Sequence, residues 1–141
     1  RGASLVEIYQ NCPIFNDGAF DALRTPGSPA VIPLVHGRPI TFAHDTLGVV
    51  RADGRLQVRP LADVDRADLV VHDAHATDAA LAFELAELTD TQGLSASPIG
   101  IFRDVERSVF DDEARRQVTM PADREAALTR LIAGPDTWTV G

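Results

Sequence analysis

The chain has 141 residues, 45% of them hydrophobic and 24% charged, which is the composition of one globular domain with a core of its own. Its formal charge is −8, and all 13 basic side chains are arginines, so it is poorly suited to bind duplex nucleic acid or an anionic membrane. Because it has no lysine, it supplies neither a Walker-loop lysine nor a Schiff-base lysine.

The first residues of the chain, its apolar runs and its cysteine content bear on the cellular location of the protein. No apolar run approaches the roughly 20 residues of a membrane-spanning helix, and no signal-peptide pattern is present. Arg1 stands where a complete protein has Met, and strand-like sequence follows directly. The lone thiol of Cys12 excludes an intrachain disulfide and is typical of a reducing compartment. We therefore expect a soluble, cytoplasmic piece of a larger protein.

The first elements of the chain are a strand, a turn-rich loop and a linker. Residues 4–10 (SLVEIYQ) lack polar alternation and predict a strand covered on both faces, as in a parallel sheet. Turn formers at residues 11–18 end it, and a helical turn is expected at residues 19–24. The TPGSP run at residues 25–29 is the predicted linker.

Short strands dominate the middle of the chain. They are predicted at residues 30–35 and 39–42. Residues 48–51 and 55–59 flank an Ala-Asp-Gly turn and predict a β-hairpin. Residues 68–72 (DLVVH) predict another buried strand.

An amphipathic helix follows, with Thr77 or Asp78 as its cap and Gly93 beyond its end. Its expected core stripe is Leu81, Leu85 and Leu88.

The last third of the chain predicts a strand at residues 98–102, a charged helix at 111–117 and an edge strand at 136–140. Pro121 is expected to open a final helix that Gly134 and Pro135 end. The expected core stripe of that helix is Leu128, Leu131 and Ile132. Strands followed by helices, more than once, indicate an α/β or α+β fold.

Cys12 is the residue most suited to chemistry, because it follows a predicted buried strand in a tight loop. Three interpretations fit it: a buried small hydrophobe, a catalytic thiolate that needs a base in contact, and one ligand of an iron–sulfur cluster. Such a cluster takes about four thiolates, so this chain would supply one.

His72, Asp73 and His75 contain zinc-ligand types, but they lie on a strand end and a helix start and need not converge. A structural role is therefore favoured for them. His36 and His44 have no motif partner. Residues 103–107 (RDVER) follow a strand and are expected to form ion pairs, at either a subunit contact or a ligand.

Four segments resemble the β subunit of 2-oxoacid:ferredoxin oxidoreductases. The most specific is LVEIYQNCPIFNDG at residues 5–18, followed by HGRPI (36–40), VVHD (70–73) and IGIFRDVER (99–107). They occur in the order of the family and span most of the chain. The form of the first segment is most similar to the 2-oxoglutarate enzymes of this family.

The resemblance implies an α/β fold, namely the C-terminal fragment of a thiamine-diphosphate-binding-type domain plus a small α+β extension. Residues 1–24 would carry its last parallel core strand and cofactor loop, residues 25–29 the linker, and residues 30–141 the extension. Cys12 matches the last of four cysteines that hold a [4Fe–4S] cluster in the family. The other three, and the segment that binds thiamine diphosphate and Mg²⁺, match nothing in this chain.

The resemblance also implies a role in a complex. The family oxidises a 2-oxoacid to an acyl-CoA with coenzyme A and passes electrons to ferredoxin. The chain alone would carry no catalytic residue and bind no cofactor by itself; its partners would be the α subunit and ferredoxin. The alternative is a non-catalytic module that docks the α subunit or ferredoxin, which the linker at residues 25–29 and the elements after it favour.

Overall fold

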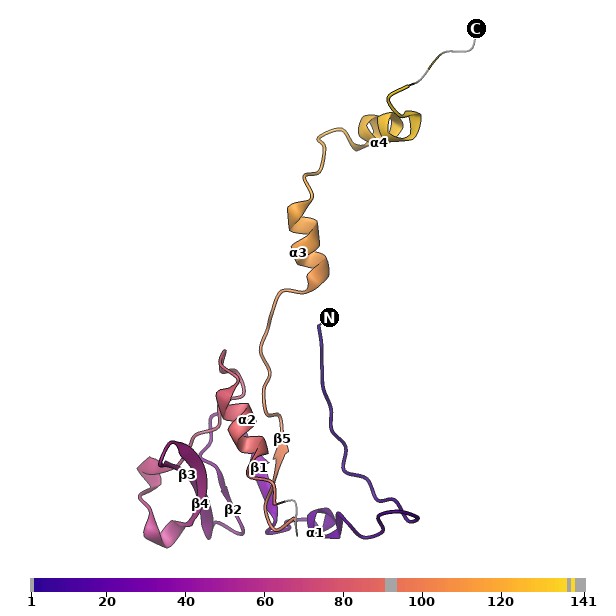
Figure 1. Ribbon diagram of the computed structural model, residues 1–141. Coiled ribbons are helices and arrows are strands. Elements are labelled where there is room, and N and C mark those ends of the chain that lie inside the picture. The colour runs from indigo at the N-terminus through magenta and orange to yellow at the C-terminus, as the bar shows by residue number, and fades with distance from the viewer. Residues whose placement is uncertain (1, 91–93, 137, 139–141) are drawn as a thin grey trace. The chain divides into compact units, whose positions relative to one another are not determined.

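The structure of the chain is a computed structural model that describes residues 2–90, 94–136 and 138. It divides into two units, Leu5–Glu106 and a second made of Arg1–Ser4 with Arg107–Gly141. Figure 1 labels the helices and strands. The TPGSP run lies inside the first unit, between α1 (Asp21–Arg24) and β1 (Val31–Leu34). The predicted helical turn and the strand after it are thereby confirmed.

An antiparallel sheet forms one half of the Leu5–Glu106 unit. Its order is β2–β3–β4, with bounds Thr41–Phe42, Leu47–Ala52 and Arg55–Pro60. The predicted hairpin is confirmed, with Val49 opposite Val58. Asp53 and Gly54 form its turn with φ of 52° and 75°, the positive values of a type I′ turn, whose twist matches that of the strands.

A parallel pair, β1 with β5 (Ser97–Gly100), forms the other half. Leu34 lies opposite Gly100, which has a φ of 141°. A Cβ added to Gly100 would lie 2.7 Å from the carbonyl oxygen of Leu34, so the close pairing requires glycine here. The chain is thus a mixed α/β structure with both parallel and antiparallel pairing.

Helix α2 (Ala80–Ala86) supplies the centre of the core. The carboxylate of Asp78 accepts the N–H of Ala80 at 2.9 Å, as predicted for the helix start. Leu85 is fully buried, and Leu81 and Leu88 pack at the edge of the same cluster. The predicted stripe is therefore confirmed, while Gly93 lies outside the described residues. The buried partners of Leu85 are Ile32, Leu34, Ile40, Phe42 and Val49.

Two predicted strands differ from the structure. Residues 4–10 pair with no strand among the described residues, and Leu5 is 97% exposed. A strand needs a neighbour to take its backbone hydrogen bonds, and this extended segment meets none. Residues 68–72 form only isolated pairings, of Leu69 with Val50 and of Val71 with Pro39. Short 3₁₀ turns precede them at Leu61–Asp63 and Arg66–Asp68.

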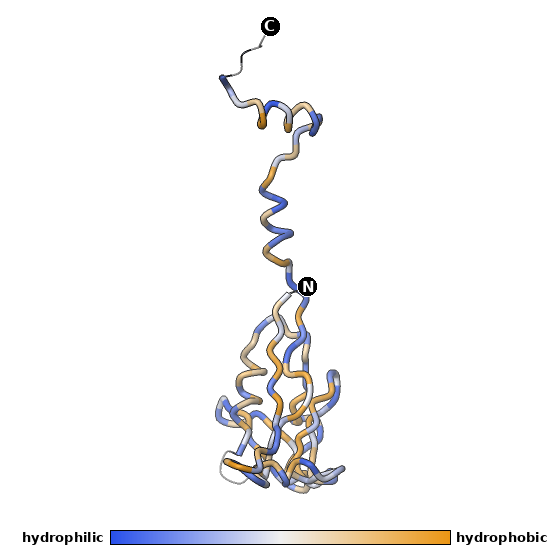
Figure 2. Tube along the Cα trace, turned by 90° about the vertical axis from the view of Figure 1, so that its right-hand side faces the viewer, coloured by the Kyte–Doolittle hydropathy of each residue, from blue (hydrophilic) through white to orange (hydrophobic). Residues whose placement is uncertain are grey.

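The second unit carries helices α3 (Phe110–Gln117) and α4 (Arg124–Ala133). The charged helix is confirmed, but α4 begins three residues after Pro121 because the carboxylate of Asp123 caps it, accepting the N–H of Ala126 at 2.9 Å. Figure 2 shows hydrophobic and hydrophilic positions alternating along α4. The predicted core stripe of α4 is exposed, at 55%, 79% and 77% for Leu128, Leu131 and Ile132.

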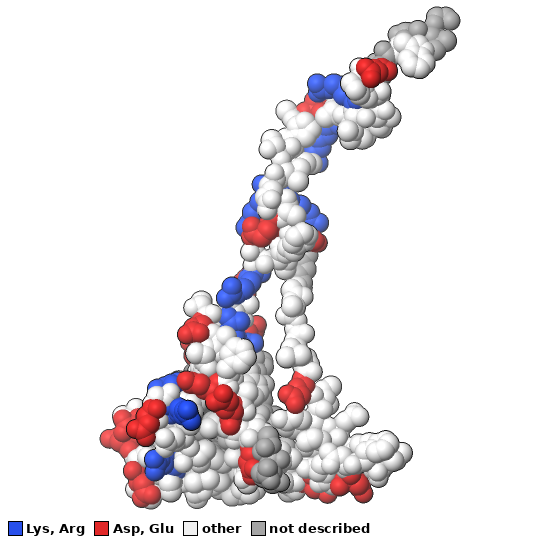
Figure 3. All heavy atoms as spheres, viewed as in Figure 1, with Lys and Arg blue, Asp and Glu red and all other residues white. Residues whose placement is uncertain are grey.

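Three further observations concern the described residues. Of the predicted edge strand at residues 136–140, only Asp136 and Trp138 lie within the described residues, and neither is in a strand. No helix in the described part of the chain is long and apolar enough to cross a membrane. Figure 3 shows acidic side chains intermixed with arginines over the β3–β4 hairpin, so this face carries no uniform basic patch.

The difference between the two leucine stripes gives a stability test. We expect Leu85→Ala to lower the free energy of unfolding by about 2–5 kcal/mol, because it empties a fully buried site. The control Leu131→Ala removes the same atoms from an exposed helix face and should stay within about 0.5 kcal/mol of the parent. Urea unfolding measures both. An equal loss of unfolding free energy in the two variants would contradict the assignment of Leu85 to the core and of Leu131 to the surface.

Candidate functional site

The loop that carries Cys12 is tied together by its own polar groups. The N–H of Asn16 donates to the carbonyl of Cys12 at 2.9 Å and closes the turn. The side chain of Asn11 then joins the two ends of the loop: its amide donates to Asp17 at 2.8 Å, and its oxygen accepts the N–H of Gly18 at 2.8 Å. Asn11 was not among the residues predicted from the sequence, although an Asn before a turn is a recognisable signal of such bonds. This small loop therefore holds its shape without support from distant segments.

Backbone N–H groups of its own loop affect the acidity of the Cys12 thiol. Those of Phe15 and Ile14 lower the pKa of Cys12 from the ordinary thiol value, whereas partial desolvation raises that pKa. The N–H of Asn16 adds a smaller lowering. Donors that favour the charged form make the thiolate easier to reach at neutral pH, and the thiolate is the form that binds metals. Cys12 as a residue is partly exposed.

The surroundings of the loop are apolar. Tyr9, before the loop, stacks on Phe20, after it, with ring centroids 4.9 Å apart and an interplanar angle of 7°. A groove of about 880 Å³ lies beside this stack, bounded on its other side by residues 41–45 and β5. At the loop tip, the side chains of Ile14 and Phe15 are almost fully exposed. The loop thus presents the Cys12 thiol next to large apolar side chains.

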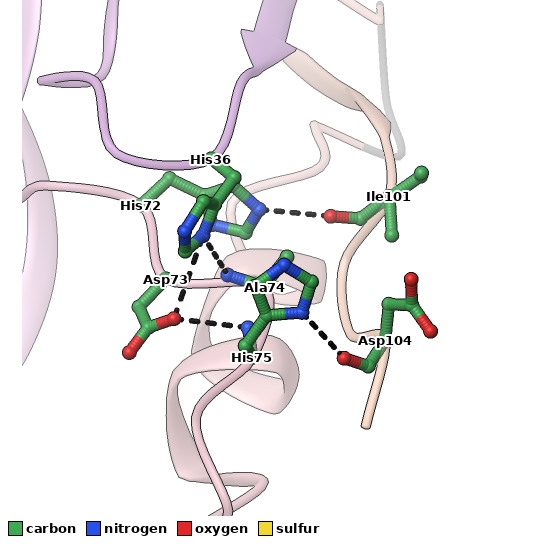
Figure 4. A network of polar contacts seen from close by, with 7 residues as sticks. All are labelled: His36, His72, Asp73, Ala74, His75, Ile101 and Asp104. Atoms are coloured by element: carbon green, nitrogen blue, oxygen red, sulfur yellow. Dashed lines mark hydrogen bonds and ion pairs between the residues drawn. The ribbon is translucent and has the colours of Figure 1, made fainter. Parts of the chain in front are cut away.

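A second cluster of polar side chains lies at the carboxyl ends of β1 and β5 (Figure 4). His36, for which the sequence suggested no partner, contacts His75 with ring centroids 4.4 Å apart. Its Nδ1 lies 3.5 Å from the carboxylate of Asp73. His72 is fully buried, and its Nε2 is 2.8 Å from the carbonyl oxygen of Ile101. In the described part of the chain, no group of three or more His, Cys, Asp or Glu side chains is placed to hold a metal ion.

The charged run at residues 103–107 is bound by backbone groups. Arg103 donates to the carbonyl of Thr77 at 2.7 Å, and the N–H of Asp104 donates to the carbonyl of Ala74 at 2.7 Å. No ion pair among the described residues joins the charged side chains of this run. Ion pairs of this run at a subunit contact or with a ligand stay a prediction.

Sequence similarity to a known protein shows to which kind of protein this chain is related. It is 48% identical, over 146 aligned residues and 99% of its own length, to 2-oxoglutarate oxidoreductase subunit KorB of Mycobacterium tuberculosis. The predicted family resemblance is confirmed. The chain spans 39% of the length of that relative and is similar to its C-terminal part.

The KorB similarity is the result on which the assignment depends. No family model matches the chain, and no solved structure matches it. The oxidoreductase relationship of the chain therefore comes from sequence identity to a β subunit of the KorB type.

The donors around Cys12 predict a measurable change in its reactivity. Phe15→Pro removes the backbone N–H that lowers the Cys12 pKa most, so this pKa should rise and alkylation at pH 7 should slow. Phe15→Ala keeps the N–H and serves as the control. The measurement is the alkylation rate of the chain's single thiol between pH 6 and 10, a range that spans the ordinary cysteine pKa of about 8.5. An unchanged pH profile in Phe15→Pro would show that the N–H groups do not set the thiol's acidity.

Proposed function

We propose that this chain is the part of a 2-oxoglutarate oxidoreductase β subunit that supplies the Cys12 thiolate to a [4Fe–4S] cluster. The observation that carries the proposal is the 48% identity to KorB over 99% of the chain, and the self-contained loop that presents the Cys12 thiol supports it. Thiolate ligation and hydrogen bonds to sulfur are the protein's two main means of setting a cluster's potential. The Cys12 loop offers both.

The donor chemistry of the loop fits this group. Sulfur is the ligand that iron–sulfur clusters take, and the lowered pKa of Cys12 favours the thiolate that binds iron. The chain contains one cysteine, so the remaining ligands would come from outside it. Within the loop, Asn11 fixes the ends and the N–H groups of residues 14–16 stabilise the negative sulfur.

The parent reaction would be the oxidation of 2-oxoglutarate to an acyl-CoA, in the cytoplasm, with coenzyme A as the acyl acceptor. Thiamine diphosphate and Mg²⁺ would bind outside this chain, and a bound cluster would supply one-electron transfer toward ferredoxin. This chain's own contribution would be to bind and orient the electron acceptor, so we assign no catalytic residue to it.

The proposed domain organisation follows from the same assignment. Residues 1–24 would be the last strand and cluster loop of a thiamine-diphosphate-binding-type domain, residues 25–29 a linker and residues 30–141 an extension. The exposure of Leu5, Val6 and Ile8 supports this proposal, because a strand with apolar residues on both faces needs neighbours on both sides. Further strands of a parallel sheet would supply these neighbours.

The test is the iron and acid-labile sulfide content of the full-length β subunit, purified without oxygen. We expect Cys12→Ala to lower both, together with electron transfer to ferredoxin, because the cluster loses one of about four thiolates. Ile14→Ala keeps the loop N–H and the thiol and should retain iron. Normal iron and sulfide in Cys12→Ala would rule out the proposal.

A second candidate function is docking of the α subunit, and the exposed stripe of α4 favours it. Leu128, Leu131 and Ile132 recur at helical spacing and are exposed. An apolar helix stripe of this kind is typical of a surface that packs against another chain. This role and the cluster role use different residues, so both can hold.

The stripe is tested by introducing a charge into it. We expect Leu131→Asp to weaken co-purification of the full-length β subunit with the α subunit by at least about tenfold, because a buried carboxylate without a partner is strongly unfavourable. Thr129→Asp adds the same charge outside the stripe on the same helix, and binding should persist. Undiminished binding of Leu131→Asp would exclude α4 as the docking element.

A further inference from the structure

A short loop of the Leu5–Glu106 unit holds the segment that follows β5. We call residues 72–75 the clasp and residues 101–106 the strap. His72 Nε2 bonds to the carbonyl of Ile101 at 2.8 Å, and His75 Nδ1 bonds to the carbonyl of Asp104 at 2.7 Å. The N–H of Asp104 returns a bond to the carbonyl of Ala74 at 2.7 Å. Because carbonyl oxygens only accept, both imidazole nitrogens are donors here.

His36 approaches the clasp from the turn after β1 (Figure 4). Its Nδ1 accepts the backbone N–H of Ala74 at 3.2 Å. The same Nδ1 lies 3.5 Å from Oδ1 of Asp73. One nitrogen therefore stands between a donor and an acceptor, and its protonation state decides which of them it can bind.

The two states of the His36 ring have opposite effects on the clasp. With a lone pair on Nδ1, the ring accepts the N–H of Ala74. With a proton on Nδ1, the ring donates to Asp73 and can no longer accept. Ala74 is buried, so its N–H would then lack a partner, which is unfavourable away from water. The side chain of His36 is 51% exposed, so protons reach it directly from solvent.

The charged groups around His36 favour this exchange. Asp73 comes from the clasp and accepts the N–H of His75 at 2.9 Å, which holds its carboxylate in place. His75 is the other titratable ring, and Arg38 lies two residues further along the turn. From the strap, the carboxylate of Asp104 points away from His36 in Figure 4, and Arg103 is bound to Thr77. Asp73 is therefore the carboxylate within reach of a protonated Nδ1.

We propose that His36 is a pH-sensitive latch on the strap. When Nδ1 gains a proton, His36 loses its hydrogen bond from the N–H of Ala74 and donates one to the carboxylate of Asp73. This exchange weakens the clasp. The loss of this bond affects the strap through the backbone of Ala74. The carbonyl of Ala74 accepts the N–H of Asp104 while the N–H of Ala74 donates to His36, and linked hydrogen bonds strengthen one another. Acid therefore loosens residues 101–106, which lead from β5 to Glu106, where the unit ends.

The variant that separates the latch from a merely structural histidine is His36→Asn. Its Oδ1 takes a position close to that of Nδ1 and accepts an N–H, but it has no proton to gain in this pH range. We expect the clasp to stay closed in this variant at every pH tested. His44→Asn is the matched control, because it removes another exposed histidine, from the β2–β3 turn, and tolerates the positive φ of 56° at that site.

The measurement is amide deuterium exchange in the full-length subunit at pH 7.5 and about pH 5.5, within the pH range in which histidine serves as a switch in proteins. After correction for the intrinsic pH dependence of exchange, clasp and strap peptides should lose about fivefold protection at the lower pH in the parent and in His44→Asn, the effect of one net hydrogen bond. His36→Asn should show no loss, and β3–β4 peptides should be unchanged in all three proteins.

Three results would overturn the latch. One is equal corrected protection at both pH values in the parent. Another is a parent-like pH response in His36→Asn. The third is an equal loss in the β3–β4 peptides, which would show general rather than local loosening.

Discussion

The burial of Leu85 is the interaction on which the Leu5–Glu106 unit depends. Its side chain lies in one buried cluster with Ile32 of the parallel pair and Val49 of the antiparallel sheet, and this cluster joins two sheets that share no ladder. A bidentate pair reinforces the position of α2 from outside: Arg51 Nη1 donates to Glu84 at 2.8 Å, and this bond lowers the pKa of Glu84. The pair is solvent-exposed, so the apolar contact carries most of the energy.

The two sites of the chain depend on this core to different degrees. The clasp precedes α2, the strap follows β5 and His36 follows β1, so their meeting requires that these elements be packed correctly. The Cys12 loop depends on Asn11, Asp17 and its own N–H groups, all within seven residues. A local site of this kind keeps its geometry as a ligand donor even where its surroundings differ.

Sequence signals within a few residues correctly predicted the elements whose structure depends mainly on neighbouring residues. The Asp53-Gly54 turn specified the hairpin, and the spacing of Leu81, Leu85 and Leu88 specified the buried face of α2. The meeting of His36 with Asp73 was not predictable, because it joins residues 37 positions apart through the pairing of residues 37–40 with residues 70–72. The predicted role of Cys12 as a cluster ligand came from a family resemblance. Residue spacing could not provide it, because a single cysteine has no partner at a recognisable distance in the sequence.

The failed predictions of burial share one cause. Residues 4–10 and the Leu128–Ile132 stripe of α4 both have the pattern of buried elements, yet both are exposed in the chain. An apolar sequence pattern reflects burial in the assembled protein, where a surface can be covered by other segments or by other subunits. The chain spans 39% of the length of a relative described as a subunit. We therefore propose that these two segments, whose apolar pattern and exposure disagree, are the places where neighbouring segments or subunits bind.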